Sequence, residues 1–191
     1  MDKIDLTINT KSQETIYQSF ERIAEDILNN FIIQIKNIQY RILNVEFYYY
    51  NFDKHPDCNV HQNKRQLNSH QWYLHKNSIN PNYHRKGIDY TFGNNGNYGG
   101  ILIKTVKNLT TDSEPLSQSN FIKNLVENLN LKHPDDTKEF KQIIEENDML
   151  QLIKSNLNKY TVEAKERINL AKPSYNGKKY AFSINLNIKK R

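Results

Sequence analysis

A glutamate interrupts a stretch of the chain that is otherwise mainly apolar and aromatic. Residues 40–50 read Tyr-Arg-Ile-Leu-Asn-Val-Glu-Phe-Tyr-Tyr-Tyr, and the acid is Glu46. Side chains alternate between the two faces of a strand, so Glu46 shares its face with Tyr48 and Tyr50. Such a carboxylate is costly unless it is exposed, paired or used in a reaction. An acid beside phenol rings suits a pocket for a flat ligand such as a nucleobase, and the alternative is a solvent-facing glutamate.

Histidines are concentrated in the segment that follows this strand. Five of the six lie within about 30 residues, at His55, His61, His70, His75 and His84. His55, Cys58 and His61 are three residues apart and could supply metal ligands for a nuclease or another hydrolase. Pro56 interrupts this spacing, and no second ligand pair of standard spacing follows. We therefore expect no bound metal and no organic cofactor, with the metal-dependent enzyme as an alternative.

The same part of the chain combines basic and aromatic residues. Between His61 and Lys107 the only acid is Asp89. The basic residues there are Lys64, Arg65, Lys76, Arg85, Lys86, Lys104 and Lys107, and the aromatic residues are Trp72, Tyr73, Tyr83, Tyr90, Phe92 and Tyr98. Basic side chains neutralise phosphates and aromatic rings stack on bases, so the mixture favours a nucleic-acid surface. The alternative is a solvated loop region whose aromatic residues belong to the core.

The composition indicates one folded domain. The chain has 191 residues, a net charge of +6, 11% aromatic residues and one cysteine. This length is typical of a single domain, and a basic balance favours an anionic partner. No signal peptide and no membrane span is visible, and one cysteine suits a reducing compartment. We expect a cytoplasmic monomer that associates with the nucleoid when it acts, with no membrane contact.

Hydrophobic periodicity predicts the elements that must position these residues. We expect an N-terminal helix over 12–29, followed by strands over 31–35 and 40–50. A long basic, histidine-rich loop region should cover 51–86, with a short strand at 72–75. A hairpin should follow over 87–106. A helical segment should cover 117–157, with helices over 117–129, 135–146 and 148–157, before strands over 166–170 and 180–188. The pattern indicates an α+β domain.

Residues 41–48 read Arg-Ile-Leu-Asn-Val-Glu-Phe-Tyr and resemble the signature strand Arg-Ile-Val-Glu-Thr-Glu-Ala-Tyr of the alkyladenine (3-methyladenine) DNA glycosylases. The match keeps Arg41, Glu46 and Tyr48 in register. Residues 99–106, 167–170 and 178–182 resemble later segments of that family in the same order. The resemblance implies one glycosylase-like domain over 1–191. Its fold would be a curved, mainly antiparallel sheet with flanking helices, as in that family and in formyltransferase C-terminal domains.

The resemblance also implies site residues. Glu46 would be the general base that activates water, and Tyr48 would stack on the flipped base. The stacking histidine would be His61 or His55, and Tyr73 would form a second aromatic wall. The expected DNA contacts are Lys64, Arg65, Arg85, Lys86, Lys104, Tyr83 and Arg167, with Tyr83 or Arg85 as a wedge if one exists. The asparagine in the family's pocket has no clear counterpart on the strand that begins at Gly87.

The implied activity is that of a monofunctional DNA glycosylase, which leaves an abasic site. Such an enzyme needs a carboxylate to take a proton from water, and no lysine is clearly placed to act as a nucleophile. The wedge and the pocket differ from the family's pattern, so the resemblance does not identify the target base. It could be a damaged base in DNA repair or a modified base of phage DNA in antiviral defence. The alternatives are a non-catalytic nucleic-acid-binding protein, the metal-dependent hydrolase and a protein-interaction module.

Overall fold

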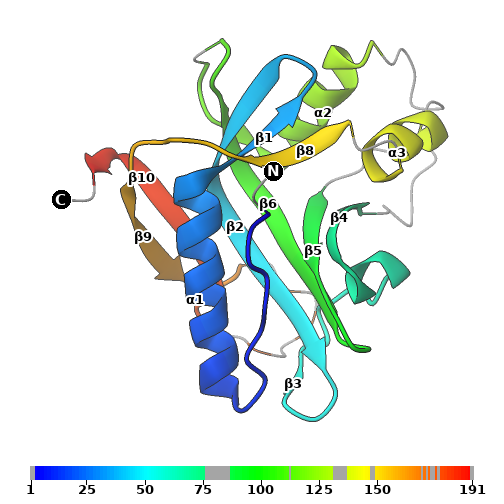
Figure 1. Cartoon of the computed structure of the whole chain (residues 1–191), viewed down its shortest axis with the longest axis vertical. Helices are drawn as coiled ribbons and strands as arrows, with labels where there is room; N and C mark the ends of the chain where they lie inside the picture. The colour runs from blue at the N-terminus through cyan, green and yellow to red at the C-terminus, as the bar shows by residue number, and fades with distance from the viewer. Residues whose placement is uncertain are drawn as a thin grey trace.

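The computed structural model describes residues 3–75, 87–111, 113–130, 137–146, 149–168, 170, 172, 175 and 177–189 (Figure 1). Its helices are α1 (Gln13–Asn30), α2 (Gln118–Asn128) and α3 (Thr137–Glu145), with a short 3-10 helix η1 (Lys64–Leu67). Its strands are β1 (Phe31–Ile35), β2 (Ile38–Asn51), β3 (His55–Pro56), β4 (Ser69–Leu74), β5 (Ile88–Phe92), β6 (Tyr98–Asn108), β7 (Leu116–Ser117), β8 (Leu150–Lys154), β9 (Tyr160–Lys165) and β10 (Ala181–Lys189).

These strands form one curved antiparallel sheet, and β2 lies at its centre. The main path of the sheet runs β4-β5-β6-β2-β1-β8, while β10 pairs with β2 and β9 pairs with β10. Because β2 is long, β1 pairs with its first part and β10 pairs with residues further along it. The sheet curves into a half-barrel, and α1 lies against one of its faces (Figure 1). The described part of the chain is therefore a single α+β domain, as the sequence predicts.

The core lies between α1 and the face of β2 that the alternation predicts. Phe20 on α1 is fully buried and stacks on Phe47 of β2, with 4.9 Å between the ring centroids. Tyr49, two residues further along β2, meets the same Phe20 ring edge-on. Strand side chains alternate, so Glu46 and Tyr48 point to the opposite face, away from α1. The core thus fixes the face on which a site around Glu46 must lie.

A capping box begins α1 at the residue that the sequence predicts. The Ser12 hydroxyl accepts a hydrogen bond from the Thr15 amide, and the Thr15 hydroxyl accepts one from the Ser12 amide. We expect Ser12→Ala to lower the free energy of unfolding by about 1 kcal/mol, because the Thr15 amide loses its hydrogen-bond acceptor. Urea denaturation measures this change. Ser119→Ala, at an exposed serine, is the control; an equal loss in both variants would contradict the role of the cap.

Two C-terminal predictions are wrong. The helix expected over 148–157 is strand β8, which pairs with β1 along its full length. Without β8, the outer edge of β1 would leave a row of unpaired backbone groups, and pairing there outweighs local helix propensity. The strand expected over 166–170 lies earlier, at β9, and residues 166–168 form no strand. The helices over 117–129 and 135–146 and the strand over 180–188 are confirmed as α2, α3 and β10.

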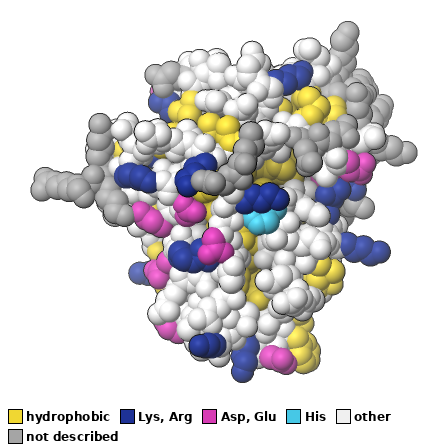
Figure 2. All heavy atoms as spheres, in the orientation of Figure 1, with side chains coloured by type: hydrophobic (Ala, Val, Ile, Leu, Met, Phe, Trp, Pro, Cys, Tyr) yellow, Lys and Arg dark blue, Asp and Glu magenta, His cyan; other side chains and the backbone are white. Residues whose placement is uncertain are grey.

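The surface that carries α1 has mixed charge. Among the described residues of this face, Lys and Arg side chains lie between Asp and Glu side chains, without a large region of one sign (Figure 2). Interspersed charges of this kind are typical of a solvated face, so the described part of this face lacks the basic surface expected of a nucleic-acid interface. Within the described ranges, no helix is long and apolar enough to cross a membrane.

Candidate functional site

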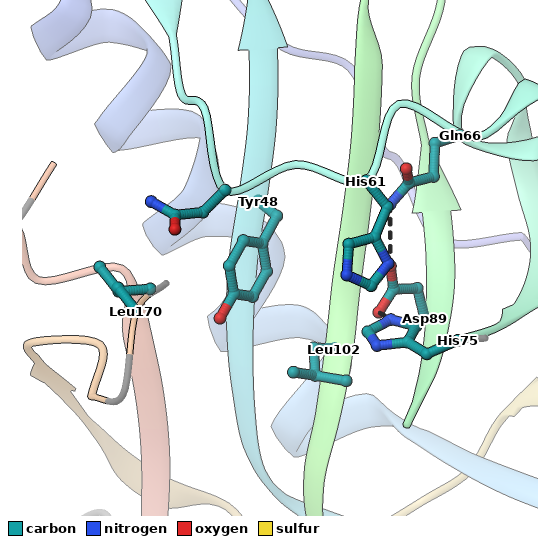
Figure 3. A pocket seen from close by; sticks show the side chains of 8 residues that line it. Tyr48, His61, Gln66, His75, Asp89, Leu102 and Leu170 are labelled. Atoms are coloured by element: carbon teal, nitrogen blue, oxygen red, sulfur yellow. Dashed lines mark hydrogen bonds and ion pairs between the residues drawn. The ribbon is translucent and has the colours of Figure 1, made fainter. Parts of the chain in front are cut away.

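A pocket of about 180 Å³ opens on the face of the sheet opposite α1 (Figure 3). Its lining comes from β2, β5 and β6, from the segment between β3 and β4, from the residue that follows β4, and from the chain after β9. The lining residues are Tyr48, Asn59, His61, Gln66, His75, Asp89, Leu102 and Leu170. The volume lies below the roughly 300–1,000 Å³ of pockets that hold drug-sized molecules, so it suits one ring system.

Glu46 is buried beside this pocket, with a partner for each carboxylate oxygen. Only 3% of the residue is exposed. The Tyr48 hydroxyl donates a hydrogen bond of 2.8 Å to Oε2, and Nζ of Lys104 lies 3.5 Å from Oε1. Leu102, which lines the pocket, is paired with Glu46 across β2 and β6. The structure therefore excludes the solvent-facing alternative for Glu46 and brings together Glu46, Tyr48 and Lys104 of the residues predicted from sequence.

Tyr48 is supported from beneath by a buried ion pair. The guanidinium carbon of Arg167 lies 4.5 Å from the centre of the Tyr48 ring. Nη1 of Arg167 donates to Oδ2 of Asp57 at 2.7 Å and to the Phe47 carbonyl at 3.1 Å. Burial and the nearby Glu46 carboxylate raise the pKa of Tyr48 above its ordinary value. The tyrosine therefore remains a neutral hydrogen-bond donor at physiological pH.

This position of Arg167 corrects the prediction that it contacts DNA. Both side chains of the Arg167–Asp57 pair have no exposed surface. A guanidinium in this position cannot reach a backbone phosphate, because it lies under the wall of the pocket. The sequence does not reveal the partner, since Asp57 and Arg167 are 110 residues apart. Arg167 packs against the Tyr48 ring instead of reaching the surface.

Histidines line the side of the pocket across from Tyr48 (Figure 3). The rings of His61 and His75 meet with 4.3 Å between their centroids. Tyr73 lies behind this wall, with its hydroxyl 3.3 Å from Nδ1 of His61. Tyr73 is therefore not a wall of the pocket as predicted. It supports His61, which does line the pocket.

Asp89 anchors the histidine wall. His75 Nε2 donates to Oδ1 of Asp89 at 2.6 Å, and Gln66 Nε2 donates to Oδ2 at 2.9 Å (Figure 3). A Cβ atom at Gly100 would lie 2.5 Å from the Asp89 carboxylate, so only glycine at that position leaves room for this network. Asp89, His75 and Gln66 were not predicted as site residues. The available signal was that Asp89 is an isolated acid in a basic, aromatic region.

His55 lies outside the pocket, so of the two predicted stacking histidines it is His61 that lines the pocket. The His55 ring is fully buried on the α1 side, donates from Nδ1 to the Tyr49 carbonyl at 2.8 Å and accepts from the Tyr180 hydroxyl at 3.0 Å. Cys58 is exposed, and the described residues contain no group of three His, Cys, Asp or Glu side chains that could hold a metal. His55 lies on the α1 side of the sheet and His61 lines the pocket on the other side, which argues against a metal site that uses both histidines.

The surroundings of two histidines give a prediction about pH. Burial lowers the pKa of His55, while partial desolvation in the pocket and the neighbouring His75 lower that of the more exposed His61. We expect both rings to titrate below about 6.5, the ordinary value. Below that pH the unfolded chain then binds more protons than the folded one, so stability falls as the pH falls. NMR titration measures both midpoints, with the urea-unfolded protein as the control. A folded midpoint at or above the unfolded one would contradict the prediction.

The other predicted DNA contacts have different surroundings. Lys64 is exposed at the start of η1. Arg65 forms an ion pair of 3.0 Å with the buried Glu145 of α3, so its guanidinium also joins η1 to that helix. Tyr83, Arg85 and Lys86 lie outside the described residues.

Comparison with known proteins gives one distant relative and no family. No family model matches the chain. An uncharacterized protein of Acanthamoeba polyphaga mimivirus is 29% identical over 123 residues, which cover 56% of this chain and 56% of that protein. The chain thus spans about half the length of this relative. The likeness leaves the function to be argued from the site itself.

Arg41, the first residue of the glycosylase-like string, is structural here. It is 4% exposed, and Nη2 donates to the carbonyl oxygens of Leu28 and Asn158. Its guanidinium also lies 4.7 Å from the centre of the Tyr160 ring. These bonds join α1, β2 and the segment before β9. Of the three residues that the string keeps in register, Tyr48 lines the pocket and Glu46 lies beside it.

Proposed function

We propose that the protein is a DNA glycosylase that flips a base into the pocket and hydrolyses its glycosidic bond. The observation that carries the proposal is Glu46, a buried carboxylate on the central strand, hydrogen-bonded to the aromatic wall of a pocket for one ring system. Pockets with convergent polar groups and a buried acid are the usual place for catalysis. The basic net charge of +6 favours a nucleic-acid partner.

The walls of the pocket suit an extruded base. Flipping a nucleotide out of a duplex costs a few kcal/mol, and stacking on an aromatic ring returns about 1–3 kcal/mol per base. Tyr48 and His61 provide ring surfaces, and the polar residues Gln66, His75 and Asn59 also line the pocket, with the Nε2 atoms of Gln66 and His75 already bonded to Asp89. Leu102 and Leu170 complete the lining with apolar surface. The pocket thus combines stacking with edge recognition.

The chemical step falls to Glu46. Its carboxylate takes the proton of an attacking water and stabilises the positive charge that develops on the sugar in an oxocarbenium-like transition state. Tyr48 holds one carboxylate oxygen and Lys104 lies near the other, so the group is oriented before the substrate arrives. The product is DNA with an abasic site and the free base.

A panel of modified DNA tests the proposal. Duplexes with alkylated, deaminated or hypermodified bases are incubated with the protein in the presence of a chelator, and abasic sites are detected as strand breaks after alkali. Breaks on at least one modified duplex and none on the unmodified control support the glycosylase and identify a damaged or a viral modified base. Binding without breaks on any duplex would replace the proposal with a binding protein, and no binding at low salt with an interaction module.

A second reaction is favoured by the position of Lys104. Its Nζ lies 3.5 Å from Oε1 of Glu46, which places an amine beside the site, but the ion pair favours the charged ammonium, so the amine must lose its proton before it can attack. Attack of the neutral amine on C1′ of the sugar would break the glycosidic bond and release the base, and opening of the sugar ring would then give the imine from which a glycosylase-lyase cleaves the strand. Breaks before alkali, together with trapping of the protein on DNA by borohydride, would favour this reaction. Breaks only after alkali would favour the monofunctional enzyme.

A further inference from the structure

Four side chains that line the pocket can carry or lose a proton, and three of them are held by other contacts. The Tyr48 hydroxyl donates to Glu46, and burial raises the pKa of Tyr48, so it keeps its proton. Both oxygens of Asp89 accept hydrogen bonds, one of them from Nε2 of His75. Nδ1 of His75 is turned toward Gly87, where a Cβ atom would lie 2.9 Å from it. None of the three presents a free proton donor to a bound base.

His61 is the fourth of these side chains, and one of its nitrogens is open. The ring reaches into the pocket from the segment between β3 and β4, across from Tyr48 (Figure 3). Nδ1 lies 3.3 Å from the Tyr73 hydroxyl, whose oxygen can accept a hydrogen bond from it. Within the described ranges no hydrogen bond reaches Nε2. The residue is exposed at the mouth of the pocket, so water can restore a proton that Nε2 has given up.

The surroundings of His61 favour release of a proton. The titratable groups that face it are His75, Tyr73, Asp89 and Tyr48. Desolvation and the neighbouring His75 lower the pKa of His61, and the more distant Asp89 opposes them. An imidazolium with a lowered pKa is a stronger acid, although a smaller share of it is protonated at neutral pH.

From this geometry we propose that His61 is a catalytic acid, which gives the proton of Nε2 to a ring nitrogen of the leaving base. The proposal rests on the proposed function, because it requires a base that leaves. The bond between C1′ and the base breaks, its electron pair stays with the base, and the proton from His61 keeps that base uncharged. The oxygen of water bonds to C1′, and Glu46 takes the proton of that water. Solvent then reprotonates His61 and deprotonates Glu46.

This role depends on the charge of the base. A neutral base would leave as an anion unless it gains a proton, so its release needs the acid. A cationic, ring-alkylated base leaves as a neutral molecule without a proton. If His61 only stacked on the base, a variant with another aromatic ring would release both kinds of base as the wild-type protein does.

His61→Phe tests the proposal, because phenylalanine keeps a ring but has no proton to give. Its single-turnover rates are measured on the neutral and the cationic base that the wild-type protein releases best, for example hypoxanthine and 7-methylguanine in duplexes. We expect at least about 100-fold slower release of the neutral base and less than about threefold slower release of the cationic one. The cationic duplex thus controls for folding and DNA binding. Equal slowing on both bases, or a wild-type rate on the neutral base, would overturn the proposal.

The pH dependence provides a test that needs only the neutral base. Measured below saturation, the wild-type rate should fall about tenfold per pH unit above the midpoint of His61, because only the imidazolium gives a proton. That midpoint should match the one that NMR titration gives for His61 in the free protein. His61→Phe should lose this fall. A wild-type profile without the fall, or a fall that persists in the variant, would overturn the proposal.

These outcomes separate the acid from the glycosylase. If the neutral base is released and His61→Phe changes neither the rate nor the pH profile, the acid is another group and the glycosylase stands. Release of cationic bases alone by the wild-type protein would also overturn the role of His61 and leave the glycosylase standing. If no duplex of the panel yields an abasic site, the glycosylase fails and the role of His61 fails with it.

Discussion

Replacing Glu46 with glutamine is expected to lower the rate of abasic-site formation by about 10²–10⁴-fold, the usual contribution of a general base. Glutamine has the same shape and can still accept the hydrogen bond that Tyr48 donates to Glu46 at 2.8 Å. It cannot take a proton from water or offset positive charge on the sugar. The rate is measured in single turnover on the duplex that the wild-type protein cleaves best, and DNA affinity should change little.

Glu163→Gln is a matched control for this prediction. Glu163 is also a strand glutamate near a lysine, with Lys165 at 3.0 Å, but half of its side chain is exposed. We expect its variant to keep the wild-type rate. A Glu46→Gln variant that also keeps this rate would show that another group activates the water. Loss of DNA binding together with activity, in a variant that still folds, would assign Glu46 to binding instead of the chemical step.

Much of the frame around Glu46 can be predicted from sequence because it depends on local patterns. The alternation of residues 40–50 separates the core side, with Phe47 and Tyr49, from the side that carries Glu46 and Tyr48. The spacing of apolar residues and the Ser12 cap predict α1 almost to the residue. Each signal reflects a period of about 3.6 or 2 residues within one element, so it needs no knowledge of distant partners.

The remaining features depend on contacts between distant residues. β8 is a strand because it pairs with the free edge of β1. The sequence of residues 148–157 contains no local signal for this pairing. In the pocket, the Asp89 carboxylate holds the side chains of His75 and Gln66 by hydrogen bonds. His75 is 14 residues and Gln66 is 23 residues from Asp89 in the sequence. Single-sequence reasoning can mark an isolated acid such as Asp89 as unusual. It cannot identify which donors the fold brings to it.

The largest effect on stability is expected from Arg167→Met, which should lower the free energy of unfolding by about 3–5 kcal/mol. The Arg167–Asp57 pair has no exposed side-chain surface. Removal of the arginine leaves a buried carboxylate without its cation, and it also removes the group beneath the Tyr48 ring. Chemical denaturation monitored by circular dichroism measures the loss. A change below about 1 kcal/mol, as is typical of exposed ion pairs, would show that the pair is not buried in solution.

Two further variants separate the loss of charge pairing from the loss of side-chain contacts. Lys165→Met removes the cation of an ion pair whose side chains are 62% and 49% exposed, so we expect a loss of about 0–1 kcal/mol.

Asp57→Asn combined with Arg167→Met removes both charges of the buried pair. If the unpaired carboxylate causes most of the cost, the double variant should be more stable than Arg167→Met alone, because residues in contact are not additive. A double variant that is less stable by the sum of both single losses would instead attribute the cost to packing, with Arg167 acting as a support for Tyr48 and not as a counter-charge.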